Sequence, residues 1–221
     1  MYNNRKRKEL IVMNKNVIIS IGRQFGSGGH EIGEKLAERL GIPFYDRNLV
    51  TMAADKLHIS PGKAEESDEK DMDRFLAYYA STSMHYASMY MNEELFEPIS
   101  QKVFEAQREI IETLASKGSC IIVGRCADDI LRDQPGLINV FITADKKDRI
   151  KRIAEKYELS DRKAAERIRK VERERRYYYE KHTGKSWGDI SSHQIMLNVS
   201  QLGIDKAVDV LEALYKANLG T

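Results

Sequence analysis

The 221-residue sequence has only two cysteines, no long apolar run and almost no excess of charge of one sign. Cys120 and Cys126 cannot build the disulfide framework of a small secreted protein, and no Cys/His spacing typical of a zinc site accompanies them. No apolar stretch approaches the roughly 20 residues of a membrane-spanning helix. The net charge of +2 favours neither a nucleic acid nor an anionic membrane as partner. We therefore expect a cytoplasmic protein.

Two further absences bear on domain organisation. There are no internal repeats and no low-complexity linkers, so nothing divides the chain into independent domains. Residues 1–15 carry a basic cluster, but the apolar segment Leu10–Met13 that follows is too short for a secretory signal. We expect residues 1–15 to form a disordered basic leader, with Met13 as an alternative start, and residues 16–221 to form a single domain.

The strongest local signal lies in residues 17–41. An apolar, β-branched segment predicts a buried strand, a glycine-rich loop follows, and apolar residues then recur every four positions as in an amphipathic helix. In such a unit the loop amides and the helix N-terminus together favour the binding of a phosphate group. A glycine-rich turn without a ligand stays open as the alternative. The loop glycines are Gly22, Gly26, Gly28 and Gly29, and the helical apolar positions are Ile32, Leu36 and Leu40.

The loop departs from the Walker A pattern G-x-x-x-x-G-K-[ST]. Gly29 stands where that pattern has the phosphate-binding lysine, and His30 stands where it has the magnesium-binding hydroxyl. Arg23 falls on the first glycine and is the candidate substitute for the missing lysine; pairing with an acidic core residue is its alternative role. Since Mg²⁺ prefers oxygen ligands, His30 is a poor partner, which leaves Ser27 or a shell of water.

Four more apolar segments follow, with helical patterns between them. The segments are residues 42–45, 119–123, 137–143 and 194–199, and the clearest helical patterns cover residues 101–117, 146–157, 205–217 and a stretch beginning at Ser160. Alternation of this kind predicts an α/β fold with a five-stranded parallel sheet flanked by helices.

Charged residues follow two of these segments directly. Asp46 and Arg47 come after the second strand, and Arg125 comes after the third. The carboxyl ends of parallel strands form the edge where ligands bind, and a guanidinium group suits a phosphate. We therefore expect Arg125 to bind a phosphate group, with pairing to Asp128 or Asp129 as the alternative. Asp46 contacts the ligand or caps the following helix.

Two other stretches have an unusual composition. Residues 78–91 are rich in Tyr and Met, which is more typical of a core or a subunit surface than of a cofactor site, so homo-oligomerisation is one hypothesis. The helix after Ser160 carries a dense series of Arg and Lys, which is most often only a solvated face.

Four segments carry a resemblance to a known family. They are ISIGRQFGSGGHEIGEKLAERLGIPFYDRNLV at 19–50, IIVGRCADDIL at 121–131, YYYEKHTGKSWGD at 177–189 and LNVSQLGIDKAVDVL at 197–211. Together they resemble the cytidylate-kinase-like family, a branch of the nucleoside monophosphate kinases, from about Asn16 to about Leu214. Absence of the Walker lysine is typical of this branch.

The resemblance implies a P-loop kinase-like domain with a helical monophosphate-binding insertion at 48–101 and a lid at about 160–190. It implies ATP and Mg²⁺ as donor and cofactor, and small-molecule nucleotides, rather than nucleic acid or membrane, as partners. Arg173 and Arg175 match the basic positions of the lid, although Glu172 stands where relatives carry Asp. From the residues and the resemblance together, we expect catalytic roles for Arg23, Arg125, Arg173 and Arg175, donor-phosphate binding by Gly26, Ser27, Gly28, Gly29 and His30, and acceptor binding by Asp46, Arg47, Arg125 and Asp128.

Two functional hypotheses follow. The first is ATP-dependent phosphoryl transfer to a nucleoside monophosphate, with CMP or dCMP as the leading acceptors. The second is a nucleotide-binding regulatory protein that keeps the kinase fold and turns over little or not at all; Gly29 and His30 favour it because they remove two catalytic groups.

Overall fold

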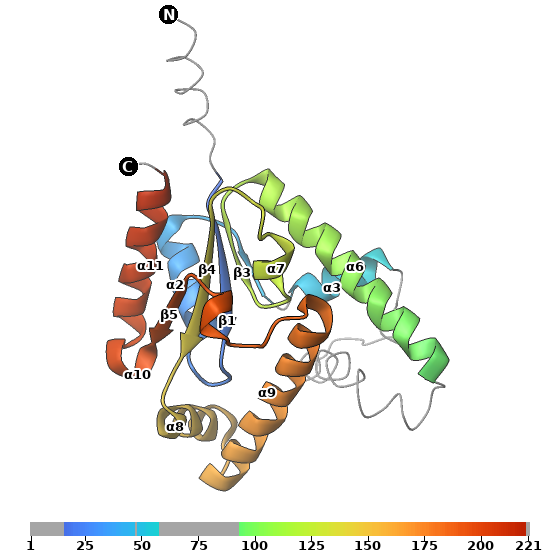
Figure 1. Ribbon diagram of the computed structural model, residues 1–221. Coiled ribbons are helices and arrows are strands. Elements are labelled where there is room, and N and C mark those ends of the chain that lie inside the picture. Colours follow the sequence, from blue (N-terminus) through green and yellow to red (C-terminus); the bar gives the residue numbers. More distant parts are fainter. Residues whose placement is uncertain (1–15, 47, 58–92, 220–221) are drawn as a thin grey trace, which may run out of the picture. The chain divides into compact units, whose positions relative to one another are not determined.

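The computed structural model describes residues 16–46, 48–57 and 93–219 (Figure 1). The chain divides into two compact units, one formed by Met1–Asp46 with Leu114–Thr221 and the other by Arg47–Thr113. The expected leader, Arg47, most of the helical insertion and the Tyr/Met-rich stretch lie outside the described residues.

The first unit contains the predicted five-stranded parallel sheet. Its strands run in the order β2-β3-β1-β4-β5, and every neighbouring pair is parallel. β1 is therefore central, and the loop that follows it opens at the middle of the carboxyl edge. The strands are β1 (Ile18–Arg23), β2 (Phe44–Tyr45), β3 (Cys120–Val123), β4 (Leu137–Thr143) and β5 (Ile195–Asn198).

The central strands of the sheet are buried on both faces and are mostly apolar, with Ser20 and Asn139 as buried polar residues. Side chains of β1 alternate between the faces, and those on one face join a buried cluster with α2 (Gly29–Leu40) and α11 (Ile204–Leu219). Ile32 and Leu36 of α2 are fully buried there, as the four-residue spacing predicted. A fully buried side chain of this size contributes roughly 1.5–3 kcal/mol. α2 and α11 lie side by side on this face (Figure 1).

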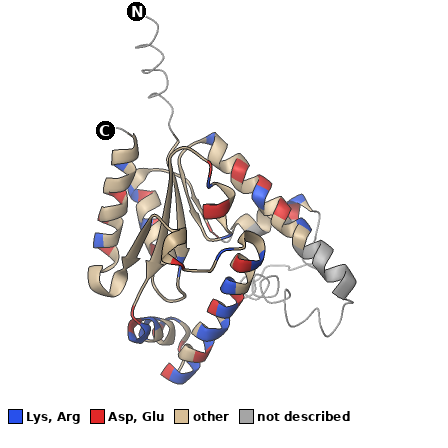
Figure 2. Cartoon of the chain, in the orientation of Figure 1, with Lys and Arg blue, Asp and Glu red and all other residues tan. Residues whose placement is uncertain are grey.

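Two basic helices follow β4. α8 (Lys146–Tyr157) has the predicted bounds, and α9 (Asp161–Thr183) begins after Ser160, whose hydroxyl accepts a hydrogen bond from the Lys163 amide. A small apolar cluster of Ile153, Ala164 and Ile168 packs α8 against α9. Figure 2 shows, in blue, that Lys and Arg residues recur along both helices.

The remaining helices vary most from the sequence-based expectation. α6 (Glu93–Lys117) begins eight residues before the predicted start, while α7 (Ala127–Ile130) and α10 (Val199–Leu202) are single turns that the pattern did not predict. In the second unit, α3 (Asn48–Lys56) and α6 are joined by an ion pair between Lys56 and Glu109. None of the helices in the described ranges is both long and apolar enough to cross a membrane.

Candidate active site

The glycine-rich loop, residues 24–28, connects the central strand to the N-terminus of α2. Gln24 continues the strand pairing, since its amide donates to the Ile142 carbonyl at 3.0 Å and its side-chain oxygen accepts from the Ala144 amide at 3.1 Å. Gly28 precedes the helix with a φ of 88°, a left-handed conformation that suits glycine. The amides of the first helical turn have no acceptor within the helix, so they are available to an anion.

Ser27 is committed to the loop itself. Its hydroxyl donates to the Gln24 carbonyl at 2.9 Å, its amide lies 3.3 Å from the same oxygen, and the residue is only 1% exposed. This placement leaves Ser27 a structural group of the turn, not a ligand for a cation.

Two side chains that the sequence analysis did not assign hold the loop from the side of α8 and α9. Arg149 donates to the carbonyls of Ala144 at 3.1 Å and Phe25 at 3.4 Å, and to the Glu172 carboxylate at 2.5 Å. The same Glu172 oxygen accepts from the Phe25 amide at 3.3 Å. Glu172 therefore ties α9 to the loop. Apart from Ala144, which is 5 residues from Arg149, these partners are 23 to 147 residues apart, so no local pattern could have revealed them.

Arg23 lies across the start of α2. A Cβ atom added at Gly29 would meet the Cβ of Arg23 at 2.7 Å and its Cγ at 3.1 Å. A Cβ added at Gly124 would meet Nη1 of Arg23 at 2.1 Å. The arginine side chain therefore fills the space at the position of the Walker lysine and extends toward the end of β3.

Asp46 receives the guanidinium group of Arg23. Its Oδ1 lies 3.2 Å from Nη2 of Arg23, and its Oδ2 lies 2.6 Å from Nδ1 of His30. Burial alone would raise the pKa of Asp46, but the charge of Arg23 and the hydrogen bond from His30 lower it to about 2. Asp46 is thus an ionised carboxylate that orients both side chains. The ion pair that was considered as an alternative role for Arg23 is formed.

Arg125 stands on a strained turn after β3. Gly124, Arg125 and Cys126 have φ values of 74°, 59° and 56°, three left-handed residues in succession. A left-handed conformation costs a non-glycine residue roughly 1–2 kcal/mol, and such strain is concentrated at functional sites. Within the described residues no carboxylate forms an ion pair with Arg125, and its guanidinium lies 6.0 Å from the centre of the Tyr178 ring.

The carboxylates considered as partners of Arg125 are engaged elsewhere. Asp128 accepts from the Tyr179 hydroxyl at 2.7 Å, and Asp129 lies 2.8 Å from the Lys185 ammonium group. Burial raises the pKa of Asp128. The candidate acceptor-binding residue Asp128 is thus close in sequence to Arg125 but hydrogen-bonded to α9.

The two lid arginines have different surroundings. Arg175 donates to the Arg23 carbonyl at 3.1 Å and lies over the Phe25 ring, whereas Arg173 is exposed. Burial, followed by the charges of Arg23 and Arg125, lowers the pKa of Arg175. A bound anion would offset this repulsion, so the three guanidinium groups around Asp46 favour a phosphate ligand.

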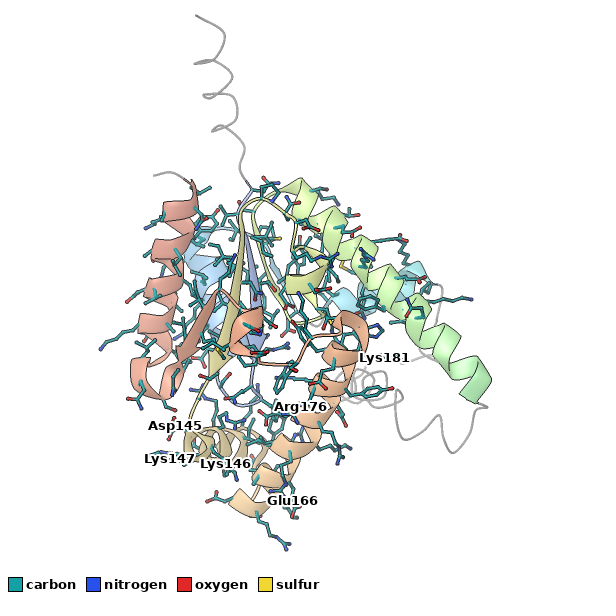
Figure 3. The ribbon with its side chains drawn as sticks, viewed as in Figure 1. Asp145, Lys146, Lys147, Glu166, Arg176 and Lys181 are labelled. Atoms are coloured by element: carbon teal, nitrogen blue, oxygen red, sulfur yellow. The ribbon has the colours of Figure 1, made fainter. Side chains whose placement is uncertain are left out.

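A pocket of about 450 Å³ lies on the side of the loop that faces α8, opposite the cluster of arginines around Asp46. Gly26 and Ser27 form its boundary with the loop, α8 contributes four charged side chains, and Ala144, Val199 and Ser200 come from the segments after β4 and β5. Asp145, Lys146 and Lys147 mark the passage from β4 into α8, and Glu166, Arg176 and Lys181 mark α9 (Figure 3). The side chains from α8 are Asp148, Lys151, Arg152 and Glu155.

A glycine-rich loop thus lies between a pocket and a cationic cluster on a parallel sheet with the strand order β2-β3-β1-β4-β5. The sequence profile of the cytidylate kinase-like family matches residues 18–201. The chain belongs to the cytidylate kinase-like family. A comparison with curated protein sequences found no match.

Solved structures share the fold of the chain. An uncharacterized protein from Eubacterium ventriosum ATCC 27560 is 28% identical, with a TM-score of 0.67 over 91% of this chain and 99% of that one. A shikimate kinase from Bacteroides thetaiotaomicron is 15% identical, with a TM-score of 0.50 over 90% of this chain and 98% of that one. The second likeness shows the fold alone. The cytidylate kinase-like chain thus has the fold of a P-loop kinase.

Proposed function

We propose that the protein transfers the γ-phosphoryl group of ATP to a small acceptor that itself carries a phosphate, with CMP and dCMP as the leading acceptors. The observation that carries this proposal is the separation of two sites by the loop. The pocket lies with the segments after β4 and β5, while Asp46 and Arg125 follow β2 and β3. Since β1 lies between these strand pairs, a donor and an acceptor would meet over the loop.

In this proposal the pocket takes the nucleoside of the donor. The amides at the start of α2 bind its phosphates, and the cluster of Arg23, Arg125 and Arg175 neutralises the acceptor phosphate and the group in transfer. Phosphoryl transfer requires mainly positioning and cancellation of charge, which these groups supply. Mg²⁺ is the cation expected with ATP, and it would bridge the phosphate oxygens of the donor.

An acceptor screen tests the proposal. Each nucleoside monophosphate, and each parent nucleoside as an acceptor without a phosphate, is supplied with Mg-ATP, and the phosphorylated product is separated by chromatography. Arg125→Ala, purified in the same way, reports any kinase carried over from the expression host. Phosphorylation of CMP or dCMP by the wild type alone supports the proposal, while turnover only on acceptors without a phosphate contradicts it.

A regulatory nucleotide-binding protein is the second candidate. The observations that favour it are the glycine at position 29 and the occupation of the Phe25 amide by Glu172, which leave the loop fewer groups for a triphosphate. Tight ATP binding without turnover on any acceptor would establish this function in place of the first.

A further inference from the structure

The imidazole ring of His30 is held on two sides near the start of α2. Its Nδ1 is hydrogen-bonded to Asp46 at 2.6 Å, and its ring packs edge-on against Phe44 with the centroids 5.4 Å apart. The side chain nevertheless remains 47% exposed. The ring orientation is therefore fixed in the absence of a ligand, while part of the ring stays accessible.

The bond to Asp46 also fixes the tautomer. An ionised carboxylate only accepts hydrogen bonds, so Nδ1 of His30 carries the proton, and Nε2 of the neutral ring keeps its lone pair. No residue in the described part of the chain is hydrogen-bonded to Nε2. A histidine whose other nitrogen donates to a carboxylate is the usual arrangement of a metal-binding imidazole.

The place of His30 in the loop indicates which cation is concerned. His30 aligns with the residue whose hydroxyl binds the nucleotide's magnesium ion in a Walker A loop. Ser27, the other candidate oxygen ligand of the loop, is 1% exposed and bound to Gln24. The neighbouring arginines do not oppose a cation here, because it arrives bound to a triphosphate and the complex is negative overall.

We propose that Nε2 of His30 coordinates the divalent cation of the metal–nucleotide complex. This inference rests on the proposed function, since it requires a nucleotide on the loop. Imidazole is a better ligand for transition-metal ions than for Mg²⁺, which prefers oxygen. The protein therefore favours the Co²⁺ complex of ATP over the Mg²⁺ complex, and Mn²⁺ serves below only as the spectroscopic probe.

Pulsed electron paramagnetic resonance of Mn²⁺ tests the coordination directly. The probe is Mn²⁺ with the β,γ-methylene analogue of ATP, which cannot be hydrolysed and has no nitrogen in its phosphate chain. We expect the spectrum of the wild-type complex to show the ¹⁴N coupling of a bound imidazole. Growth on ¹⁵N-histidine should convert it to a ¹⁵N coupling without any change of sequence.

Two variants assign the signal to one residue. His30→Thr restores a Walker-type hydroxyl and should abolish the nitrogen coupling, while the matched control His182→Gln, which removes a histidine from α9, should keep it. Calorimetric titration of the two metal complexes should show the ratio of Co²⁺ to Mg²⁺ affinity falling about 10-fold in His30→Thr. The labelling experiment keeps the test decisive if this variant folds poorly.

Two results would overturn the inference, and they can be told apart. If the Mn²⁺ complex binds the wild type with oxygen ligands only, the coordination by His30 is refuted and the proposed function stands. If neither metal complex of the analogue binds the wild type, the proposed function falls as well.

Discussion

Arg23 and Gly29 form a single structural solution at the position of the Walker lysine. The stem of Arg23 occupies the space in which a side chain at position 29 would begin, and its guanidinium reaches Asp46 and Gly124. The positive charge is therefore supplied from the end of β1 and is held by a carboxylate, unlike a flexible lysine on the helix. At the scale of single residues, Arg23 with Gly29 therefore provides the positive charge that a Walker lysine would place next to the loop.

Replacing Gly29 by Lys should not restore a Walker loop. The new Cβ would lie 2.7 Å from that of Arg23, so one of the two side chains must move and the Arg23–Asp46 pair is strained. Overpacking of this kind typically costs about 1–3 kcal/mol. We expect a lower thermal midpoint and lower turnover in Gly29→Lys, measured by calorimetry and by the phosphoryl-transfer assay. A rise in turnover would show that the lysine position is vacant in solution.

Arg23→Ala should reduce turnover about 100-fold or more, because a charged contact to the phosphates is lost. ATP affinity and the thermal midpoint are measured on the same preparation. Lys35→Ala is the matched control, since Lys35 is a cation of α2 on an exposed ion pair with Asp205. A lowered midpoint with unchanged ATP affinity would limit Arg23 to its pair with Asp46 and end the lysine-substitute hypothesis.

Arg125→Lys tests the acceptor site, since lysine keeps the charge but loses the planar fork that binds two phosphate oxygens. We expect the KM for the nucleoside monophosphate to rise and activity to fall, while ATP binding stays near that of the wild type. The left-handed backbone at Arg125 is unaffected by this exchange of one non-glycine residue for another. If the binding of ATP and of the nucleoside monophosphate were weakened equally, Arg125 would have a structural role.

At the scale of elements, α9 joins the loop through residues on one of its faces. Glu172 contacts the Phe25 amide and Arg175 contacts the Arg23 carbonyl, so both ends of the segment 23–25 are bonded to the same helix. The basic series of α9 therefore has two environments, and Arg173 belongs to the exposed one. The sequence-based grouping of Arg173 with Arg175 comes from the resemblance to the family's lid, which does not distinguish their surroundings.

Arg175→Ala should lower kcat far more than Arg173→Ala, by roughly 10-fold or more for loss of a charged group at the transferring phosphate. If Arg175 acts mainly on the transition state, the KM values of Arg175→Ala for ATP and for the acceptor should differ little from those of the wild type. The two single variants serve as each other's control because they remove the same side chain from the same helix. Equal kcat values for the two variants would contradict the placement of Arg175 at the site.

The long elements were predictable, and the short ones and the side-chain network were not. Apolar patterns indicated all five strands and located α8 and α11 closely. A helix buries one apolar stripe and a central strand buries both faces, and each leaves a periodic signal in the sequence. Single turns such as α7 and α10 have too few residues for a periodic signal. The pairing of Arg149 with Glu172 depends on packing between two helices, which periodicity does not encode.

At the scale of the whole molecule, the strand order places two different groups of residues at the two halves of the sheet's carboxyl edge. Because β1 is central, the segments after β2 and β3 supply Asp46 and Arg125 on one side of the loop, and the segments after β4 and β5 supply the pocket on the other. The resemblance of four separated segments predicted this fold, and the observed five-stranded sheet and the likeness to a shikimate kinase structure confirm it. The fold does not determine which acceptor binds, because that depends on side-chain contacts with the acceptor. The identity of the acceptor is therefore part of the proposed function.

Acid unfolding should depend on Asp46, whose carboxylate organises this edge. Its pKa is about 2 in the folded state against 3.8 for a free side chain, so its stabilising contribution is fully present above pH 4 and disappears as the pH falls toward 2. That shift corresponds to roughly 2 kcal/mol. We expect the difference in unfolding free energy between the wild type and Asp46→Asn to shrink by about this amount between pH 5 and pH 2, as measured by urea titration at each pH. Asp133→Asn, which removes a carboxylate whose side chain is 92% exposed, is the control. Parallel curves for the wild type and Asp46→Asn would show that the Asp46 carboxylate is not held ionised by Arg23 and His30, and would remove the basis for a fixed His30 tautomer.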